Sequence, residues 1–288
     1  MTDPRPIGVF DSGVGGLTVL SEVLRRLPDE PTIYLGDNAR TPYGVRPNDE
    51  IQRFSAECLA ELVARDVKVI VVACNTSSAV ALEQLRERFD LPILGVVRPG
   101  AAAAALATRN GRIGVIATPA TVRSRAYFAA IKDENAALHV VEQATPELVP
   151  LVEAGVLEGP EADAAVERSV APLANAGTDT LLLGCTHYPL LLPVIARAVG
   201  PGTAVVDAAA ATAGSLAELL AVNGLQAPAR NGGPVAHYQL TTGDVRTFER
   251  TARVLFGDRF ADVSAVEVGR SAPATGPRPR ATAVGTAR

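Results

Sequence analysis

Short apolar runs alternate with segments of helical periodicity along most of this chain. The apolar runs have the length and composition of buried strands, and they span residues 7–10, 32–35, 67–73, 93–97, 113–117, 140–141, 180–183, 205–206 and 238–241. Between them, apolar residues recur every three or four positions, as Leu17, Leu20, Val23 and Leu24 do. Because strands that alternate with helices are typical of parallel sheets, we predict an α/β fold.

A weak internal repeat relates two parts of the chain. Ile7-Gly-Val opens one part and Ile113-Gly-Val opens the other, at an offset of 106 residues. Cys74 and Cys185 are separated by a similar offset of 111 residues. Chance similarity between short apolar strands is the alternative for the first match alone. The agreement of the two offsets indicates two similar α/β halves whose strand ends share one cleft, a common place for ligands.

Cys74 and Cys185 each follow a buried strand and precede a polar turn. The segments read Lys68-Val-Ile-Val-Val-Ala-Cys74-Asn-Thr and Thr180-Leu-Leu-Leu-Gly-Cys185-Thr-His. Open α/β sheets bind ligands at the carboxyl ends of their strands, and backbone N–H groups at a helix start lower the pKa of a thiol. Two such thiols on opposite faces of a substrate suit a reaction that removes a proton from one face and returns it on the other.

The third cysteine fits a structural interpretation. Cys58 lies in a helical pattern with Ile51, Phe54, Leu59 and Leu62, so we expect it in the core. No two cysteines have CxxC spacing and their number is odd, which gives no support for a disulfide framework or a zinc site. We therefore expect no metal, and a reducing compartment.

Composition narrows the class of protein. The 288 residues are 48% hydrophobic, which allows a sizeable core, and the net charge of −4 predicts no nucleic-acid surface. No apolar stretch is long enough to span a membrane, and the N-terminal residues contain no signal region. We expect a soluble cytoplasmic protein. Lys68 and Lys132 are the only lysines, which disfavours pyridoxal phosphate chemistry because it needs a Schiff-base lysine.

The segment Asp11-Ser-Gly-Val-Gly-Gly16 follows the first predicted strand and opens a helix. Glycines there let a ligand approach the backbone, and a helix N-terminus favours anions. The spacing is GxGG rather than the GxGxxG of dinucleotide sites, and no Gly-Lys-Ser/Thr segment of a P-loop is present. A substrate carboxylate on these amides fits better, and a helix N-cap by Asp11 or Ser12 is the structural alternative.

Among the histidines, His187 is a candidate for acid–base chemistry because it lies two residues after Cys185. His139 and His237 lack such neighbours, so we interpret them as structural. Residues 40–44, Arg-Thr-Pro-Tyr-Gly, have the composition of a loop whose tyrosine and amides could line a cleft.

Four segments together resemble the signature motifs of the bacterial glutamate racemase family. They are Asp11-Ser-Gly-Val-Gly-Gly16, Pro42-Tyr43-Gly44, Cys74-Asn75-Thr76 and Gly184-Cys185-Thr186-His187-Tyr188-Pro189-Leu190, in the family's order and spacing. The resemblance extends from about residue 7 to about residue 257. The combination is specific for cofactor-independent amino-acid racemases, and the versions found here favour glutamate over aspartate.

The resemblance implies cofactor-independent conversion of L-glutamate to D-glutamate for peptidoglycan synthesis, and so for cell-wall biogenesis and cell shape. It implies that Cys74 and Cys185 are the proton donor and acceptor, with Cys185 deprotonating L-glutamate and Cys74 deprotonating D-glutamate. Asp11 would assist Cys74, and Glu153 with His187 would assist Cys185. The substrate would be held by Asp11, Ser12, Pro42, Tyr43, Gly44, Asn75, Thr76, Thr118, Thr121, Thr186 and His187.

By the same likeness, two similar parallel-sheet α/β domains are related by pseudo-twofold symmetry, with the active site in the cleft between them. Residues 1–98 and 206–268 would form the first domain, residues 99–205 the second, and the family suggests a homodimer. Residues 269–288 are rich in arginine and proline and contain no acidic residue, so we predict a disordered tail. Residues 230–234 are expected to form a turn.

Three other interpretations remain open from the residues. The protein could act on aspartate or a hydantoin within the same superfamily, which the relative turnover of L-glutamate and L-aspartate would decide. It could bind or sense an amino acid without catalysis, which turnover would exclude. A nucleotide-binding oxidoreductase is the third alternative, and the glycine spacing disfavours it.

Overall fold

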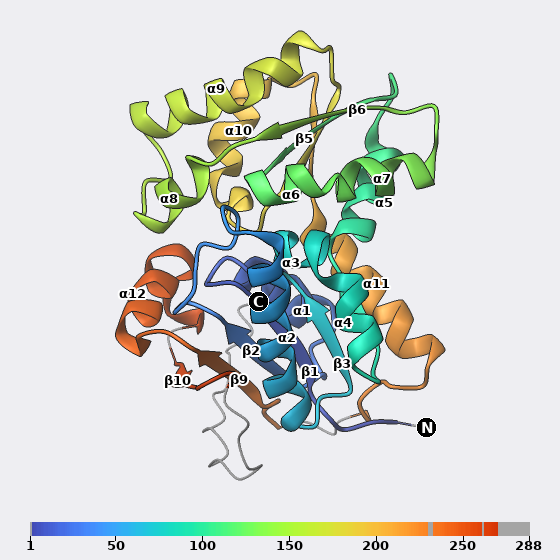
Figure 1. Cartoon of the computed structure of the whole chain (residues 1–288), viewed down its shortest axis with the longest axis vertical. Helices are drawn as coiled ribbons and strands as arrows, with labels where there is room; N and C mark the ends of the chain where they lie inside the picture. Colours follow the sequence, from blue (N-terminus) through green and yellow to red (C-terminus); the bar gives the residue numbers. More distant parts are fainter. Residues whose placement is uncertain (1, 230–232, 261, 270–288) are drawn as a thin grey trace.

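The computed structural model describes residues 2–229, 233–260 and 262–269, which form two parallel sheets surrounded by helices. In Figure 1 the four-stranded sheet lies above the six-stranded sheet. The strands are β1 (Ile7–Asp11), β2 (Thr32–Gly36), β3 (Val69–Val72), β4 (Ile93–Gly95), β5 (Arg112–Ala117), β6 (His139–Ala144), β7 (Thr180–Gly184), β8 (Ala204–Asp207), β9 (His237–Thr241) and β10 (Ser264–Ala265). The predicted α/β fold is confirmed.

The two sheets repeat one strand order. The six-stranded sheet runs β10-β9-β2-β1-β3-β4, and the four-stranded sheet runs β6-β5-β7-β8, with every strand pair parallel. The register repeats as well, since Ile7 of β1 pairs with Val69 of β3 and Ile113 of β5 pairs with Thr180 of β7. The internal repeat seen in the sequence is therefore a repeat of sheet topology.

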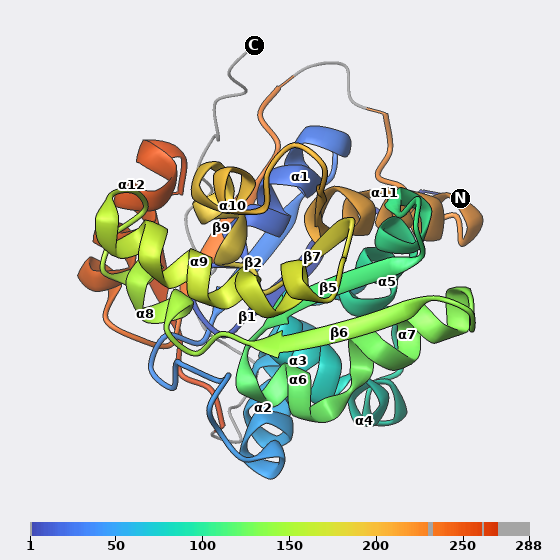
Figure 2. The ribbon, with the colours of Figure 1, turned by 90° about the horizontal axis from the view of Figure 1, so that it is seen from above.

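Helices cover both faces of each sheet. They are α1 (Leu17–Arg26), α2 (Asn48–Ala64), α3 (Asn75–Val80), α4 (Leu82–Arg88), α5 (Val97–Ala107), α6 (Pro119–Ser124), α7 (Ala126–Glu134), α8 (Leu148–Glu153), α9 (Pro160–Asn175), α10 (Leu192–Val199), α11 (Ala208–Val222) and α12 (Val245–Phe256). The first sheet packs against α1, α11 and α12 on one face and α2 and α4 on the other. The second sheet packs against α8, α9 and α10 on one face and α5 and α7 on the other (Figure 2).

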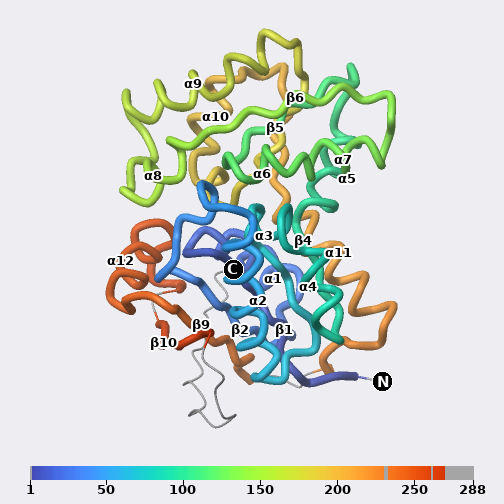
Figure 3. Tube along the Cα trace, in the orientation of Figure 1, coloured from blue at the N-terminus to red at the C-terminus, as the bar shows by residue number. Residues whose placement is uncertain are grey.

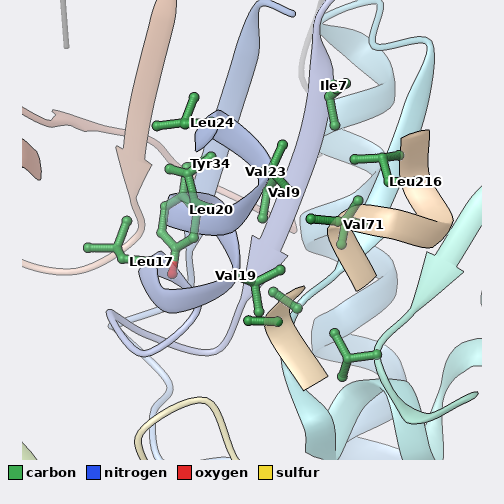
Figure 4. Close-up of a cluster of buried hydrophobic side chains, with 14 of the residues drawn as sticks. Ile7, Val9, Leu17, Val19, Leu20, Val23, Leu24, Tyr34, Val71 and Leu216 are labelled. Carbon is green, nitrogen blue, oxygen red and sulfur yellow. The ribbon is translucent and has the colours of Figure 1, made fainter. Parts of the chain in front are cut away.

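Burial on both faces explains the continuous apolar character of the strands. Along β1, Ile7 and Val9 point into the cluster shared with α1 and α11, and Phe10 points into the cluster shared with α2. Figure 4 shows Val9 and Val71 of neighbouring strands in the same cluster as Leu216 of α11. Truncating Leu216, which is fully buried, to alanine is expected to cost about 2–5 kcal/mol of unfolding free energy.

The chain passes from the first sheet to the second after β4, and α11 returns it to the first sheet after β8 (Figure 3). We propose that each sheet with its helices is one domain, in line with the division expected from the sequence. The expected boundary between residues 205 and 206 falls within β8, which pairs with β7 through Asp207.

The elements differ from the sequence predictions at a few places. The strand predicted over residues 93–97 ends at Gly95, and Val97 begins α5. A Cβ at Gly95 would lie 2.3 Å from Oγ of Ser78, so only glycine fits there. The two-residue strand β10 was too short to predict. Part of the predicted turn at 230–234, residues 230–232, lies outside the described residues, and so does nearly all of the predicted tail, residues 270–288.

The helices of the described residues are all too short or too polar to cross a membrane.

Candidate active site

The carboxyl ends of the central strands in both sheets contribute to one cleft. Ser12 follows β1, Cys74 comes shortly after β3, Thr118 follows β5 and Cys185 follows β7. The cleft encloses about 590 Å³ including its open mouth, and it is lined by Ser12, Thr41, Pro42, Tyr43, Gly44, Val45, Cys74, Asn75, Thr76, Thr118, Pro119, Thr145, Pro146, Val149, Pro150, Cys185, Thr186 and His187. This is the edge at which parallel α/β sheets bind ligands.

Most residues predicted for the site line the cleft directly. They are Ser12, Pro42, Tyr43, Gly44, Cys74, Asn75, Thr76, Thr118, Cys185, Thr186 and His187. Asp11, Thr121 and Glu153 instead lie behind the lining. Asp11 contacts Thr186, Thr121 contacts Thr118, and Glu153 contacts His187. The structure therefore brings all the predicted residues together, in two shells around the cleft.

Cys74 is the N-cap of α3, and only 4% of the residue is exposed. Its Sγ accepts a hydrogen bond from the backbone N–H of Ser77 at 3.4 Å and lies 3.5 Å from Oγ of Ser12. Burial and then the charge of Asp11 raise the pKa of the Cys74 thiol to about 11, against the opposing effect of these hydrogen bonds. Cys74 is therefore a thiol at neutral pH.

Cys185 has an imidazole as its neighbour. Its Sγ lies 3.8 Å from Nδ1 of His187, and Nε2 of His187 lies 3.3 Å from Oε1 of Glu153, without the alignment of a hydrogen bond. Burial by itself would lower the pKa of His187, but Cys185 and Glu153 outweigh it and raise that pKa to about 10. His187 is therefore a cation at neutral pH, and this cation lies beside Cys185.

The glycine-rich segment after β1 binds the protein's own carboxylate. Oδ1 of Asp11 accepts a hydrogen bond from the N–H of Gly13 at 2.9 Å, the N–H of Gly16 also donates to this carboxylate, and Oδ2 accepts one from Oγ1 of Thr186 at 3.3 Å. Burial raises the pKa of Asp11, while His187 and the amides oppose the increase. The alternative of an N-cap is not realised, because α1 has Gly16 at that position and no side-chain cap.

Close packing explains why glycines occupy this segment. A Cβ at Gly16 would lie 2.4 Å from Cβ of Asp11. A Cβ at Gly15 would lie 2.5 Å from Oγ1 of Thr186 and 2.6 Å from Nδ1 of His187. The glycines therefore make room for acid–base side chains from both halves of the molecule.

Three threonine hydroxyls join the two halves at another wall of the cleft. Oγ1 of Thr76, in α3, lies 2.9 Å from Oγ1 of Thr118, which follows β5. Oγ1 of Thr121, in α6, lies 3.0 Å from that of Thr118 and 3.3 Å from that of Thr76. Thr76 and Thr118 thus present hydroxyl groups to the cleft, while Thr121 is fully buried behind them.

Comparison with known proteins identifies the family. The family model described as Asp/Glu/hydantoin racemase matches residues 7–216 of this chain. The chain belongs to this family.

Individual relatives agree with this assignment. A glutamate racemase from Shouchella clausii is 46% identical over 248 residues, which cover 86% of this chain and 89% of that protein. The crystal structure of a glutamate racemase from Bacillus anthracis is 39% identical with a TM-score of 0.85, covering 91% of this chain and 97% of that chain. A glutamate racemase structure from Francisella tularensis in complex with D-glutamate is 31% identical with a TM-score of 0.85, covering 92% and 98%. The resemblance drawn from the four motifs is confirmed.

In this member of the racemase family, Tyr43 lines the cleft, but its hydroxyl is hydrogen-bonded to another side chain of the protein. It donates a hydrogen bond to Oδ2 of Asp37, which also accepts one from Nε of Arg40 at 2.7 Å. Arg40 reaches Sγ of Cys58 as well, at 3.5 Å. Cys58, on α2, is fully buried in the core, as predicted. Tyr43 therefore supports the loop that forms this wall of the cleft.

Several lining residues were missed by the sequence analysis: Thr41, Val45, Pro119, Thr145, Pro146, Val149 and Pro150. One signal was available, because Thr145 follows β6 as Thr118 follows β5. A second sequence signal was the position of Val149 and Pro150, about one helical turn before Glu153 on α8.

Within the part of the chain that the structure describes, no three His, Cys, Asp or Glu side chains are grouped as metal ligands.

Proposed function

We propose that this protein interconverts L-glutamate and D-glutamate by a two-base mechanism in which Cys74 and Cys185 are the proton carriers. The observation that carries the proposal is the placement of two buried thiols at equivalent strand ends of two similar sheets, both on the lining of one cleft. The thiols come from opposite halves of the molecule, as a reaction on two faces of one carbon requires.

The different neighbours of the two thiols support a resting enzyme with one base and one acid. Cys185 has the cation of His187 as its neighbour, while burial and Asp11 keep Cys74 protonated. A thiolate and a thiol in the same cleft can act at once as general base and general acid. One turnover removes one proton from the substrate and returns one, so the net charge in the cleft does not change.

The proposed reaction starts with L-glutamate between the two sulfurs. The Cys185 thiolate removes the α-proton, and the carbanion-like intermediate takes a proton from the Cys74 thiol on the opposite face. The products are D-glutamate, a Cys185 thiol and a Cys74 thiolate, so atoms and charges balance. The reverse reaction begins with the Cys74 thiolate and D-glutamate. Asp11, near Cys74, and His187 with Glu153, near Cys185, are proposed to move the protons that restore the resting state.

Hydroxyl and amide groups are proposed to hold the substrate's carboxylates. The lining contains no lysine or arginine within the described residues, and His187 is its only cation. Ser12, Asn75, Thr76, Thr118 and Thr186 supply polar groups to the lining. In a cleft that excludes water, such fixed donors stabilise the negative charge that develops on the α-carboxylate in the transition state.

Glutamate is proposed as the substrate because the motif versions and the similar proteins named above point to it, and one of those solved structures contains D-glutamate. D-glutamate supply for peptidoglycan synthesis in the cytoplasm, without an added cofactor, is the cellular role that we propose. A homodimer remains a prediction.

The test is proton NMR of L-glutamate in D₂O with purified protein and no added cofactor, followed by chiral analysis. We expect loss of the α-proton signal together with appearance of D-glutamate, and much slower turnover of L-aspartate and of a hydantoin. Faster turnover of aspartate or the hydantoin would contradict glutamate specificity. Binding of glutamate without any exchange would contradict catalysis and favour a sensor of amino acids.

A further inference from the structure

Tyr127 makes a buried contact across the two halves of the molecule that the proposed mechanism does not use. It lies on α7, which packs on the second sheet, and it is fully buried. Its hydroxyl donates a hydrogen bond to Oδ1 of Asn75, the first residue of α3 in the other half. Asn75 itself lines the cleft. A residue outside the cleft therefore controls a side chain that faces the substrate.

The direction of this hydrogen bond determines which way the Asn75 amide points. Burial, followed by the charges of Asp207 and Cys185, raises the pKa of Tyr127, so its hydroxyl keeps its proton. Among the described residues, the acceptor of the Tyr127 hydroxyl proton is Oδ1 of Asn75. If the amide were reversed, the buried phenolic proton would lose its acceptor, which is unfavourable for a buried donor.

The amide's other end is then free to bind a ligand. Because Oδ1 is bound to Tyr127, the NH₂ group remains, and no hydrogen bond from it to another described residue is present. Asn75 is only 5% exposed and lines the cleft, and its NH₂ group is not one of the fully buried polar atoms, so this donor keeps access to the cleft. A donor at the cleft wall without a protein partner suits an anionic acceptor, since hydrogen bonds to charged groups are the strong ones.

We propose that Tyr127 is a positioning residue that fixes the Asn75 amide with its NH₂ group towards a carboxylate of the bound amino acid. The inference rests on the proposed function, because it needs a carboxylate substrate in the cleft. Tyr127 and Asn75 belong to different halves, so the donor is oriented only while the two halves are in contact.

A double-mutant cycle with Tyr127→Phe and Asn75→Ala tests the proposal. Each single variant should lower kcat/KM for glutamate by about 10-fold or more, mostly through a higher KM, because it loses one oriented hydrogen bond to a charged group. The double variant should be no worse than Asn75→Ala, since Tyr127 acts only through Asn75. Additive losses in a folded double variant would overturn the proposal.

Two further variants separate positioning from loss of structure. Asn75→Asp keeps an acceptor for Tyr127 but replaces the NH₂ group by oxygen, so it should fold and bind glutamate at least 10-fold more weakly by calorimetry. Wild-type affinity in Asn75→Asp would overturn the proposal even if Tyr127→Phe failed to fold. Tyr238→Phe, on β9 and outside the cleft lining, is the matched control and should keep the wild-type KM.

The wild-type protein must be assayed first. If it leaves L-glutamate unchanged, the proposed function fails and this inference fails with it. If it racemises glutamate while the cycle is additive, only the role of Tyr127 is wrong.

Discussion

The ends of β3 and β7 occupy equivalent places in the two sheets but have opposite electrostatic surroundings. Cys74 and Cys185 both follow the strand that pairs with the first strand of their sheet. At the end of β1 stands Asp11, whereas Ala117 ends β5. Two residues after each cysteine, the first half has Thr76 and the second has His187. The fold is repeated, but the anion belongs to one half and the cation to the other.

In the proposed mechanism, this difference lets a symmetric fold use one cysteine as the base and the other as the acid. A proton can be taken from one face and given to the other only if one thiol is charged and the other is not. Since the two enantiomers have equal free energies in water, kcat/KM must be the same in both directions. The asymmetry of charge can therefore set which state the free enzyme adopts, but not the equilibrium of the reaction.

Removing either active-site sulfur should have the largest effect on racemisation. Cys74→Ala and Cys185→Ala should each reduce racemisation by about 10⁴-fold or more, because each deletes one of the two proton carriers. Chiral analysis of product from L-glutamate and from D-glutamate measures the loss. Cys58→Ser is the matched control, and it should keep a near wild-type rate in folded protein. Near wild-type turnover in either active-site variant would end the two-base assignment.

Removing the cation should have the next largest effect. His187→Asn deletes the positive charge beside Cys185 and the imidazole proposed to move its proton, so kcat/KM should fall by about 10²-fold. Glu153→Gln leaves the imidazole but weakens its protonation, so a smaller loss is expected. Steady-state kinetics in both directions checks this order. Equal and small losses in both variants would show that the imidazole does not act on Cys185.

The glycine segment offers a pair of matched substitutions. Gly15→Ala should reduce kcat/KM by about 10-fold or more, because its Cβ would displace Thr186 and His187 and small misplacements of acid–base groups are costly. Gly214→Ala, on α11, meets nothing within 4 Å, so it should keep activity and stabilise the helix by about 1 kcal/mol. Kinetics and urea unfolding measure the two effects. Full activity in Gly15→Ala would contradict the packing described here.

Removing the negative charge of Asp11 should change the titration of Cys74 alone. Asp11→Asn deletes the negative charge that, after burial, raises the pKa of Cys74 to about 11. In the Cys185→Ala background, thiolate absorbance should then appear at lower pH than in the parent. An unchanged titration would show that burial alone sets the pKa of Cys74.

The smallest expected effect is the pH dependence of stability. The pKa of His187 is raised from 6.5 to about 10, so the folded state binds more protons between these values. Its stabilisation is complete below pH 6.5 and is lost as the pH rises through about 10. Cys74, raised from 9.0 to about 11, adds a loss with the same sign at higher pH. Urea midpoints of the wild type should fall over this range and those of His187→Asn should fall less, and parallel curves would contradict the pKa of His187.

Local patterns in the sequence predict the parts of this molecule that depend on neighbouring residues. The strands, the repeat and the two cysteines were found because a buried parallel strand is a continuous apolar run with a polar residue at its end. The four motifs located most of the cleft lining through their resemblance to glutamate racemases, and three of them lie at or just after the end of a strand. These predictions needed no knowledge of contacts distant in sequence.

The rest depended on contacts between distant segments. By itself Glu153 has the sequence of an ordinary helix carboxylate; the family resemblance paired it with His187, and the fold places it 3.3 Å from that residue. The glycines after β1 resembled a ligand-binding loop, but they are required by Thr186 and His187 from the other half. Tyr127 had no sequence signal, because its proposed role lies in a hydrogen bond to Asn75 in the other half of the molecule.

The central claim is that two different sulfurs exchange protons with opposite faces of the substrate. Its most direct test is the isotope content of both enantiomers when L-glutamate reacts in D₂O and is stopped at low conversion. The account predicts deuterium at the α-carbon of the D-glutamate formed and ordinary hydrogen in the L-glutamate that remains. Equal labelling of the two enantiomers, or an unlabelled product, would show that one base serves both faces and would contradict it.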